Sequence, residues 1–385
     1  MQNSLSDFHA MKLKIHNIYH RVIHFKKKSC NIDSVFGYFF VTSKSYVSPM
    51  SVDIKTLAKS LNLSISTISR ALRDSYEISD TTKLRVKEMA EKLNYYPNFH
   101  ASSLRKQKSK TIAIVIPEIT NNFFALAING IEYVANAKDY HVLIYLTHEN
   151  IKKEVGFANH LQNGRVDGVI ISLSSETNNY DHLIELKDNG TPIVFFDRIC
   201  ETIESSSITT DDFDSGFNAT EHLISCGCKR IAYLDLSRYL SISNKRMLGY
   251  MSALEKHHLG IDERLVMRFS NDNAGNEEII TELLSTPERP DGIFASVEKL
   301  AISSYKVCEK LKIKIPEELK IIGFSNLEIS SLLHPSLSTI TQPAYEIGKQ
   351  AALQLFRYLE KKNMADVHEK MILKSTLIPR GSTKK

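Results

Sequence analysis

The chain has 385 residues, of which 42% are hydrophobic and 24% are charged, so it has room for two or three domains with buried cores. Its five cysteines are scattered and odd in number, which argues against a disulfide framework and predicts a reducing, cytoplasmic location. Cys226 and Cys228 are too close together for zinc-ligand spacing and have no second pair, so we expect no metal site.

The net charge of +5 is unevenly distributed along the chain. Residues 1–49 carry 7 Lys or Arg and 2 Asp or Glu, residues 50–110 carry 12 and 6, and residues 111–385 carry 30 and 36. A basic module followed by an acidic body predicts a polyanionic partner for the module alone. The charge distribution alone is also compatible with a basic surface that contacts only solvent.

Residues 1–49 differ from the rest of the chain. They contain three lysines at 26–28, four histidines and a short apolar run at 35–41. The run is too short to span a bilayer and no clear cleavage site follows it, so we predict neither a membrane helix nor a signal peptide. The histidine spacing fits no compact metal site. We interpret residues 1–49 as a disordered extension, or as sequence upstream of a natural start at Met50.

Three helices are predicted from residue 54 onward. Asp53 can cap a helix over 54–61, Ser64 a second over about 65–72, and Ser79 a third over about 80–93. Asn62 tolerates the left-handed conformation that a tight turn often needs. The side chains expected to pack together are Ile54, Leu57, Ala58, Leu61, Leu63, Ile68, Leu72, Leu84, Val86, Met89, Ala90 and Leu93.

The second predicted helix turns polar residues outward. Two helices joined by a tight turn, the second starting with small polar residues, are typical of a helix-turn-helix that inserts its second helix into the DNA major groove. Arg70 can donate two hydrogen bonds to guanine, and Ile65 can contact a thymine methyl. The hydroxyls of Ser64, Thr67 and Ser69 suit phosphates. An ordinary three-helix bundle with a polar surface is the alternative.

A short basic segment follows the three helices. Pro97 ends the bundle because proline disfavours helix at the preceding residue. Residues 99–104 can form one or two helical turns, which are marginal in water without a partner. Leu104 is followed by four basic residues, Arg105, Lys106, Lys108 and Lys110. A leucine in this setting suits insertion between base steps in a minor groove.

From residue 111 onward, apolar runs alternate with helical stretches. The runs predicted as buried parallel strands are 112–116, 142–145, 168–172, 193–196, 231–234, 292–294 and 321–324. Helices are expected between or after them, for example at 125–138 and 345–360. This alternation predicts doubly wound parallel sheets, two of them. No GxGxxG motif or Walker-type lysine loop follows the first strand, so no dinucleotide, ATP or other cofactor is expected.

The head contains a set of short motifs: Thr56-Leu57-Ala58, Leu63-Ser64, Thr67-Ile68-Ser69-Arg70-Ala71-Leu72, Leu93-Asn94-Tyr95 and Pro97-Asn98. With these motifs, the chain resembles the LacI/GalR family of bacterial transcription regulators over about residues 52–380. The resemblance implies that Ile65, Ser66 and Arg70 read bases. It also implies that residues 98–104 form a DNA-contacting hinge helix, with Asn98, Ala101 and the intercalating Leu104. Asn62, where glycine is usual, and His100, where a small apolar residue is common, depart from the family pattern.

The resemblance implies a small all-α helix-turn-helix head and an α/β two-lobed, periplasmic-binding-protein-like body with a ligand in its cleft. The expected domains are the extension at 1–49, the helix-turn-helix domain at 50–97, the hinge helix and linker at 98–110, and an effector-binding and dimerisation domain at 111–385. Lobe 1 is expected over about 111–210 and 344–371, and lobe 2 over about 211–343 and 372–385.

Ligands bind at the carboxyl ends of strands in such sheets, and polar or aromatic residues follow several predicted strands. The effector-binding candidates are Asn121, Phe123, Phe124, Asp197, Arg198, Arg246, Glu298 and Gln342, with Asp211 and Asp212 after a further apolar run. The resemblance implies that Arg198, Arg246, Glu298 and Gln342 hold the effector.

The chemistry of these residues favours a sugar or a sugar derivative as the effector. Guanidinium and carboxylate groups can bind adjacent hydroxyls, while an aromatic ring covers the apolar face of a sugar. Phe123, Phe196 or Phe213 is expected to supply that ring. For each charged residue, a surface salt bridge or a helix cap is the alternative.

The sequence therefore predicts a cytoplasmic, ligand-controlled transcription regulator, with repression the expected activity, that binds palindromic operator DNA as a homodimer. An effector that prefers one lobe arrangement would shift the folding of the hinge on DNA, which is allostery. The alternatives are a secreted solute-binding receptor and an enzyme of carbohydrate metabolism. The helix-turn-helix and the missing signal peptide argue against the first. The missing GxSxG and HExxH motifs and the lack of paired carboxylates argue against the second, so no catalytic residue is assigned.

Overall fold

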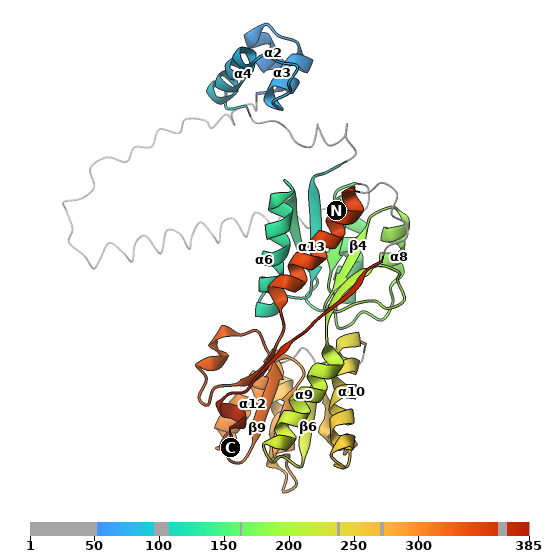
Figure 1. The fold of residues 1–385 in the computed structure, drawn as a ribbon, viewed down its shortest axis with the longest axis vertical. Helices are drawn as coiled ribbons and strands as arrows, with labels where there is room; N and C mark the ends of the chain where they lie inside the picture. The colour runs from blue at the N-terminus through green and yellow to red at the C-terminus, as the bar shows by residue number, and fades with distance from the viewer. Residues whose placement is uncertain are drawn as a thin grey trace, which may run out of the picture. The chain divides into compact units, whose positions relative to one another are not determined.

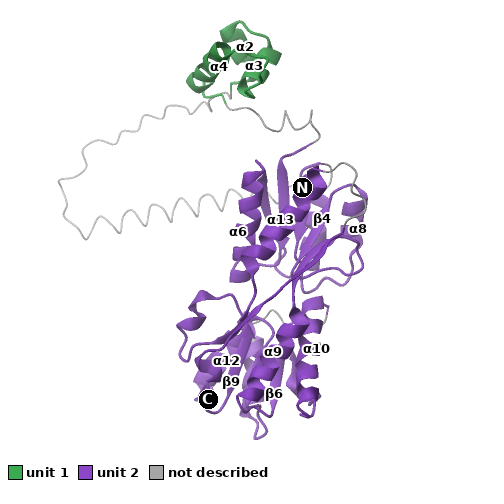
Figure 2. Ribbon diagram, in the orientation of Figure 1, with its two compact units in different colours: residues 1–97 green, residues 98–385 purple. Residues whose placement is uncertain are grey.

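The computed structural model describes residues 52–95, 108–161, 164–236, 239–269, 273–360 and 368–384. They belong to two compact units, one within residues 1–97 and one within residues 98–385, shown in green and purple in Figure 2. The extension at 1–49 and the expected hinge residues Asn98, Ala101 and Leu104 lie outside the described residues.

The first unit is a three-helix head made of α2 (Ile54–Leu61), α3 (Ile65–Leu72) and α4 (Asp80–Lys92). All three predicted N-caps are confirmed: Asp53, Ser64 and Ser79 accept hydrogen bonds from backbone N–H groups three residues later. Asn62 has the expected left-handed backbone, with φ of 53°. Each helix therefore starts where a side chain satisfies its free N–H groups, and the turn between α2 and α3 is tight.

Side chains from all three helices form the core of the head, but Leu84, which was expected in this core, is exposed. Leu57, Ile68 and Val86 are fully buried. Leu84 is 58% exposed because it lies two residues before Val86, and two residues on a helix are rotated by about 200°. On α3, Ala71 takes the fully buried position and Leu72 packs at its margin.

The second unit contains two α/β lobes, and each is built on a six-stranded sheet. In lobe 1 the sheet order is β11-β5-β4-β3-β1-β2 and all pairs are parallel. Its strands are β1 (Thr111–Ile116), β2 (His141–Leu146), β3 (Gly168–Ile171), β4 (Ile193–Phe196), β5 (Ser206–Thr210) and β11 (Lys370–Leu373). Its helices are α6 (Asn122–Ala137), α7 (Ile151–Leu161), α8 (Asp181–Asp188) and α13 (Ala344–Glu360). The buried side chains form one core with α6 and α13 and another with α7 and α8.

Lobe 2 repeats this architecture with the sheet order β12-β10-β9-β8-β6-β7, in which only β12 is antiparallel to its neighbour. Its strands are β6 (Ile231–Asp235), β7 (Val266–Arg268), β8 (Gly292–Ala295), β9 (Lys320–Phe324), β10 (Ser338–Thr341) and β12 (Thr376–Ile378). Its helices are α9 (Asp212–Ser225), α10 (Ser241–Lys256), α11 (Asn273–Ser285) and α12 (Glu298–Leu311), with short 3-10 turns at Glu263–Leu265, Glu328–Ser331 and Gly381–Thr383. The predicted fold class is therefore confirmed.

The chain passes between the lobes three times: from β5 to α9, from β10 to α13, and from β11 to β12. Figure 1 shows the last of these as the red segment that runs from one lobe into the other. Ligand sites in such sheets lie at the carboxyl ends of the strands, so the first two crossovers leave their sheets at the edge where a site is expected. No helix in the described part of the chain is long and apolar enough to cross a membrane.

Candidate functional site

The exposed side of α3 carries the side chains predicted to read DNA. Ile65 is 45% exposed, and Arg70 is exposed as well, with its Nη1 2.9 Å from Oε2 of Glu77. Exposed ion pairs contribute little free energy, so a guanine could replace Glu77 as the partner of Arg70. The hydroxyl of Ser64 lies within hydrogen-bond distance of those of Ser66 and Thr67, at 2.7 and 2.8 Å.

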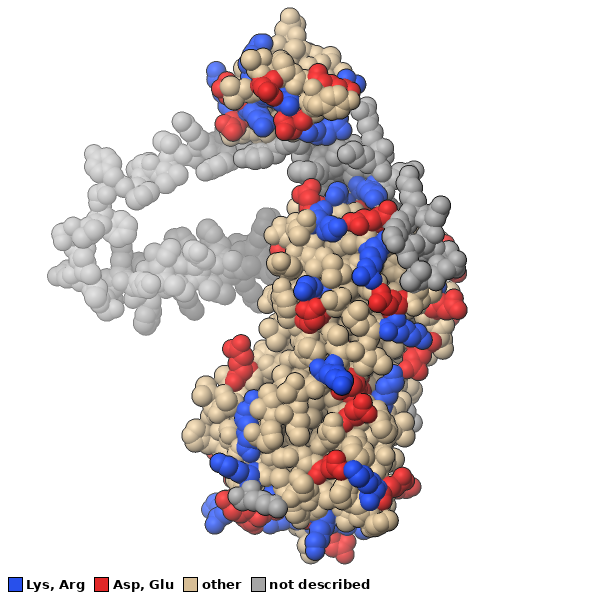
Figure 3. Space-filling view, in the orientation of Figure 1, with Lys and Arg blue, Asp and Glu red and all other residues tan. Residues whose placement is uncertain are grey.

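The basic excess of the head region is concentrated after the helices. Residues 52–95 contain eight Lys or Arg and six Asp or Glu, whereas residues 96–110 contain four basic residues and no acidic one. Figure 3 shows both charge signs on the visible face of the described head. The three helices thus supply shape and hydrogen-bonding groups, and the following segment supplies most of the net positive charge.

A pocket lies between the two lobes of the second unit, with about 390 Å³ of space that is partly open to solvent. All eight effector-binding candidates line it: Asn121, Phe123, Phe124, Asp197, Arg198, Arg246, Glu298 and Gln342. Five further residues complete the lining: Ile242, Val297, Phe324, Ser325 and Asn326. The fold therefore brings residues spread over more than half of the chain to one place, as expected from strand ends. Their role in binding stays a prediction.

The aromatic residues of the pocket differ in part from expectation. Phe123 lines it, as expected, and Phe124 and Phe324 line it as well. Phe196 is fully buried in the core of lobe 1, where its ring contacts that of Phe124 edge to face at 6.2 Å. Phe213 is 42% exposed and does not line the pocket. Of the three rings expected as alternatives, only Phe123 therefore lies at the pocket.

Arg198 follows β4 and is held by a buried carboxylate. Its Nη1 donates to both carboxylate oxygens of Glu149 at 2.8 Å and to the backbone oxygen of Leu173 at 3.3 Å. Glu149 also accepts a hydrogen bond from the backbone N–H of Ser175 at 2.7 Å. Burial opposes the charge of Glu149, but its contact with Arg198 holds the pKa of this carboxyl below its usual value.

Arg246 lies in α10 of lobe 2 and is held by a buried carboxylate as well. Its Nε donates to Oδ1 of Asp212 at 2.8 Å and its Nη1 donates to the backbone oxygen of Ser296 at 2.7 Å. The guanidinium lies 3.5 Å above the ring centroid of Phe324, a cation–π contact. Nη2 is buried and has no hydrogen-bond partner among the described residues. Burial raises the pKa of Asp212 to about 6, although Arg246 acts in the opposite direction.

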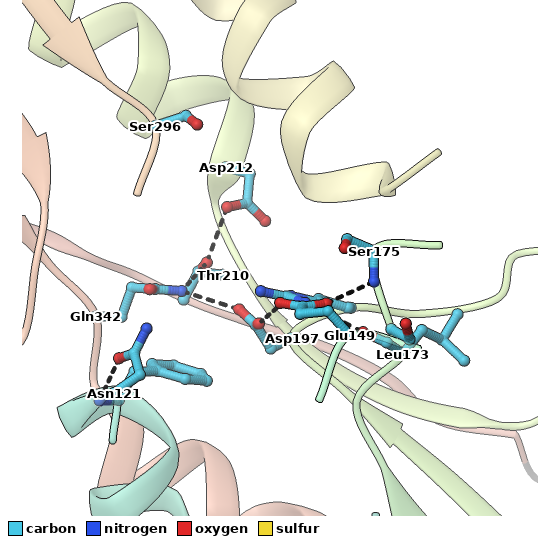
Figure 4. A network of polar contacts seen from close by, with 12 residues as sticks. Asn121, Glu149, Leu173, Ser175, Asp197, Thr210, Asp212, Ser296 and Gln342 are labelled. Atoms are coloured by element: carbon cyan, nitrogen blue, oxygen red, sulfur yellow. Dashed lines mark hydrogen bonds and ion pairs between the residues drawn. The ribbon is translucent and has the colours of Figure 1, made fainter. Parts of the chain in front are cut away.

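Two of the crossovers meet in a hydrogen-bond network at the pocket (Figure 4). Nε2 of Gln342 donates to Oδ1 of Asp197 at 3.3 Å and to the hydroxyl of Thr210 at 3.1 Å. Thr210 in turn donates to Oδ1 of Asp212 at 3.2 Å. Asp197 has a left-handed backbone with φ of 57°, an uncommon conformation that is often found at functional sites. This network links the end of β4 to the first turn of α9, and therefore one lobe to the other.

Glu298 begins α12 and accepts a hydrogen bond from the hydroxyl of Ser325 at 2.5 Å. Burial raises its pKa above the usual value. Hydrogen bonds from Ser325 and from the backbone of Asn326 and Leu327 act in the opposite direction and favour its charged form.

Comparison with known proteins identifies both units. Residues 53–98 match the sequence model of the bacterial regulatory proteins of the lacI family, and residues 220–383 match that of the periplasmic binding protein-like domain. The ribose operon repressor of Bacillus subtilis (strain 168) is 31% identical over 332 residues, which cover 86% of this chain and 98% of that protein. The chain belongs to the LacI family of bacterial transcription regulators.

Other relatives of this LacI-family regulator are similar over nearly their whole length. Catabolite control protein A of Priestia megaterium is 29% identical over 82% of this chain and 95% of that protein. The repressor CytR of Escherichia coli (strain K12) is 29% identical over 86% and 96%. The relatives are named as transcription regulators, so this chain is a DNA-binding transcription regulator too.

Solved structures support the fold. The lac repressor dimer bound to operator and an anti-inducer matches with a TM-score of 0.76 and 18% identity, over 87% of this chain and all of that one. A LacI-family regulator from Enterococcus faecium with bound ribose matches with a TM-score of 0.61 and 29% identity, over 71% of this chain and 98% of that one.

Four of the five further pocket residues of this LacI-family regulator end or follow strands that were predicted from the sequence. Val297 comes just after β8, and Phe324, Ser325 and Asn326 end or follow β9. They lie at the carboxyl ends of these strands, where ligand sites are expected. Ile242, in the first turn of α10, has no such signal.

Proposed function

We propose that this LacI-family transcription regulator is a cytoplasmic repressor that binds palindromic operator DNA as a homodimer, and that a sugar or sugar derivative bound between its lobes controls operator affinity. The observation that carries the proposal is the convergence of the eight candidate residues on one interlobe pocket. We assign residues 50–97 to DNA binding, 98–110 to the hinge and linker, and 111–385 to effector binding and dimerisation.

Operator sequence is read by the exposed side of α3. Arg70 and Ile65 contact base edges together with Ser66, while Ser64, Thr67 and Ser69 contact phosphates. Asn98, Ala101 and Leu104 add contacts from the hinge, with Leu104 between base steps in the minor groove. The distribution of basic residues supports base reading by α3 and additional DNA contacts by the hinge segment. α3 carries a single basic residue, whereas the segment after the head carries four.

A sugar suits the lining of the pocket. Asn121, Asp197, Glu298 and Gln342 supply neutral or acidic groups for hydroxyls, and Phe123 or Phe324 supplies an apolar ring face. Two related proteins point the same way, since one is a ribose operon repressor and the other was solved with bound ribose.

Self-association has support in lobe 1. β2 is an edge strand of its sheet, and it exposes Leu143 and Ile144 by 43% and 41%. An exposed apolar edge strand is normally covered, and a second copy of the chain would cover it while placing two heads on two half-sites. One head makes too few base contacts for useful specificity, so the dimer is needed for operator recognition.

The effector acts by favouring one arrangement of the two lobes. Gln342, Thr210 and Asp212 connect the lobes at the crossovers, next to the pocket. A ligand that binds the two arrangements with different affinity shifts their populations, and the shift reaches the hinge and changes its folding on DNA. The regulator represses transcription, and the bound ligand changes the strength of this repression.

The test uses the full chain in two steps. DNA sites are first selected from a random duplex library, and their binding is measured between 50 and about 200 mM salt, where phosphate contacts produce a steep salt dependence. A thermal-shift screen then compares sugars, sugar phosphates and purines, and each hit is added to the operator complex. A ligand that changes operator affinity supports the proposal. Failure to retain any duplex in a salt-dependent manner, with or without ligands, would refute it.

A further inference from the structure

Both arginines of the interlobe pocket are already neutralised by carboxylates that lie behind it. Arg198 is paired with Glu149 at 2.8 Å, and Arg246 is paired with Asp212 at the same distance. Glu149 and Asp212 do not line the pocket themselves. The two positive charges most suited to bind a phosphate or a carboxylate are therefore each paired with a negative charge before any ligand arrives.

The charges around the pocket sum to a negative value. Arg198 and Arg246 in the lining are balanced by Asp197 and Glu298. Their partners Glu149 and Asp212 then add two further negative charges. Glu118 and Lys299, which interact with this group of charges, have opposite signs and leave the balance unchanged.

These charges lie where water screens them poorly. Arg198, Glu149, Asp212 and Arg246 are 4%, 6%, 1% and 2% exposed. Electrostatic effects in buried sites are several times larger than at the surface, so an anionic ligand would meet a repulsive site. Neutral hydrogen-bonding groups face no such repulsion. Nη2 of Arg246 and Nε of Arg198 are buried and have no hydrogen-bond partner in the described chain.

We propose that Glu149 and Asp212 determine the charge selectivity of the pocket, which accepts a polyol without negative charge and rejects the phosphorylated or carboxylated form of the same polyol. The inference rests on the proposed function, since it concerns the effector that the pocket takes. It adds two specificity-determining residues, one behind each lobe's arginine.

Glu154 offers a matched control for Glu149. Both glutamates are buried, lie in or next to the start of α7, and hold the same loop: Glu149 accepts from the N–H of Ser175 and Glu154 from that of Ser174. Glu154 pairs with His182 at 3.0 Å and makes no contact with either pocket arginine. Loss of Glu154 therefore disturbs the loop without releasing Arg198.

The experiment measures binding of matched ligand pairs to the full chain by titration calorimetry. Each pair contains a neutral sugar that stabilises the protein in a thermal-shift screen, and its phosphate or uronic acid. The wild type should bind the neutral member at least about tenfold more tightly, the effect expected for one poorly screened charge. Glu149→Gln and Asp212→Asn should each reduce this ratio by about tenfold, and Glu154→Gln should leave the ratio unchanged.

Three results separate the possibilities. Tighter binding of the anionic member by the wild type overturns the inference and leaves the proposed function intact, and this comparison needs no variant. An unchanged ratio in both Glu149→Gln and Asp212→Asn, or an equal change in Glu154→Gln, also overturns it. If one variant does not fold, the other reports from the opposite lobe. Absence of binding by every sugar and every anionic derivative contradicts the proposed function instead.

Discussion

Gly216 in α9 packs directly against the backbone of Arg246 in α10. A Cβ atom at Gly216 would overlap the carbonyl oxygen of Arg246 and lie 2.9 Å from its Cα. Gly249 in α10 faces the backbone of Phe213 in α9 in the same way. The two helices therefore cross at backbone contact, and this crossing sets how far the Arg246 guanidinium reaches into the pocket.

Gly216→Ala should displace α10 and with it Arg246. We expect a loss of about 1–3 kcal/mol in the free energy of unfolding, as for other overpacked cores, together with weaker effector binding. Thermal unfolding and ligand titration of the full chain measure both. Gly156→Ala in α7 is the matched control, because nothing lies within 4 Å of a Cβ there. That change should be neutral, or stabilise by up to about 1 kcal/mol, with unaltered ligand affinity. Unchanged effector affinity in Gly216→Ala would show that the crossing does not position Arg246.

Arg70→Ala should remove sequence preference at one position of each half-site. The bidentate contact of an arginine with guanine provides about 1–3 kcal/mol of discrimination, and its exposed pair with Glu77 does not prevent it. Competition between the selected operator and a version changed at single base pairs measures the effect. Arg85→Ala in α4 removes the same charge from an exposed site outside α3. If both variants weaken all duplexes equally, Arg70 contacts phosphate rather than a base.

Leu104→Ala should weaken operator binding much more than nonspecific binding. The reason is chemical: an apolar wedge stabilises a kinked operator, whereas nonspecific binding depends mainly on phosphate charges. Leu104 lies outside the described residues, so this prediction comes from sequence alone. Affinities for operator and random duplex, measured at the same salt concentration, test it. Equal losses on the two duplexes would be incompatible with the wedge.

The pH dependence of stability should reveal the burial of Asp212. Its pKa is raised from 3.8 to about 6 in the folded protein. Between these pH values the folded state holds a proton that the unfolded chain lacks, so the free energy of unfolding falls as the pH rises. The stabilising effect of this proton is complete below about pH 4 and is lost above about pH 6.

Asp212→Asn removes this titration. Relative to the wild type, the variant should therefore gain about 1–3 kcal/mol between pH 4.5 and 7. Urea unfolding of the full chain at several pH values measures the difference. Asp214→Asn, in the same helix turn but in an exposed position, is the matched control. If the difference in the free energy of unfolding between Asp212→Asn and the wild type does not change with pH, burial does not raise the pKa of Asp212.

Much of the fold follows from interactions that are local in the sequence. The helix starts at Asp53, Ser64 and Ser79 were predictable because a cap joins groups only three residues apart. The central strands of both lobes were predictable because parallel strands buried on both faces are continuous apolar runs, as in β1 and β4. Some candidate residues of the pocket, such as Asn121 and Asp197, followed from the rule that side chains after such strands meet at one edge, whereas Arg246 and Gln342 came from the family resemblance.

Other features depend on partners that are distant in the sequence. β10 consists mostly of Ser and Thr, so it carries no apolar signal, and pairing with neighbouring strands makes it a strand. The exposure of Leu84, and the choice of Phe324 over Phe196 and Phe213 in the pocket, depend on which face of an element meets another element. Glu149 and Arg198 are separated by 49 positions, and Asp212 and Arg246 by 34. Ion pairs of this kind leave no periodic trace, because only the packing of the whole lobe brings their charges together. The sequence by itself therefore determined the family, the architecture and the place of the pocket, whereas the tertiary structure decided which charges that pocket presents.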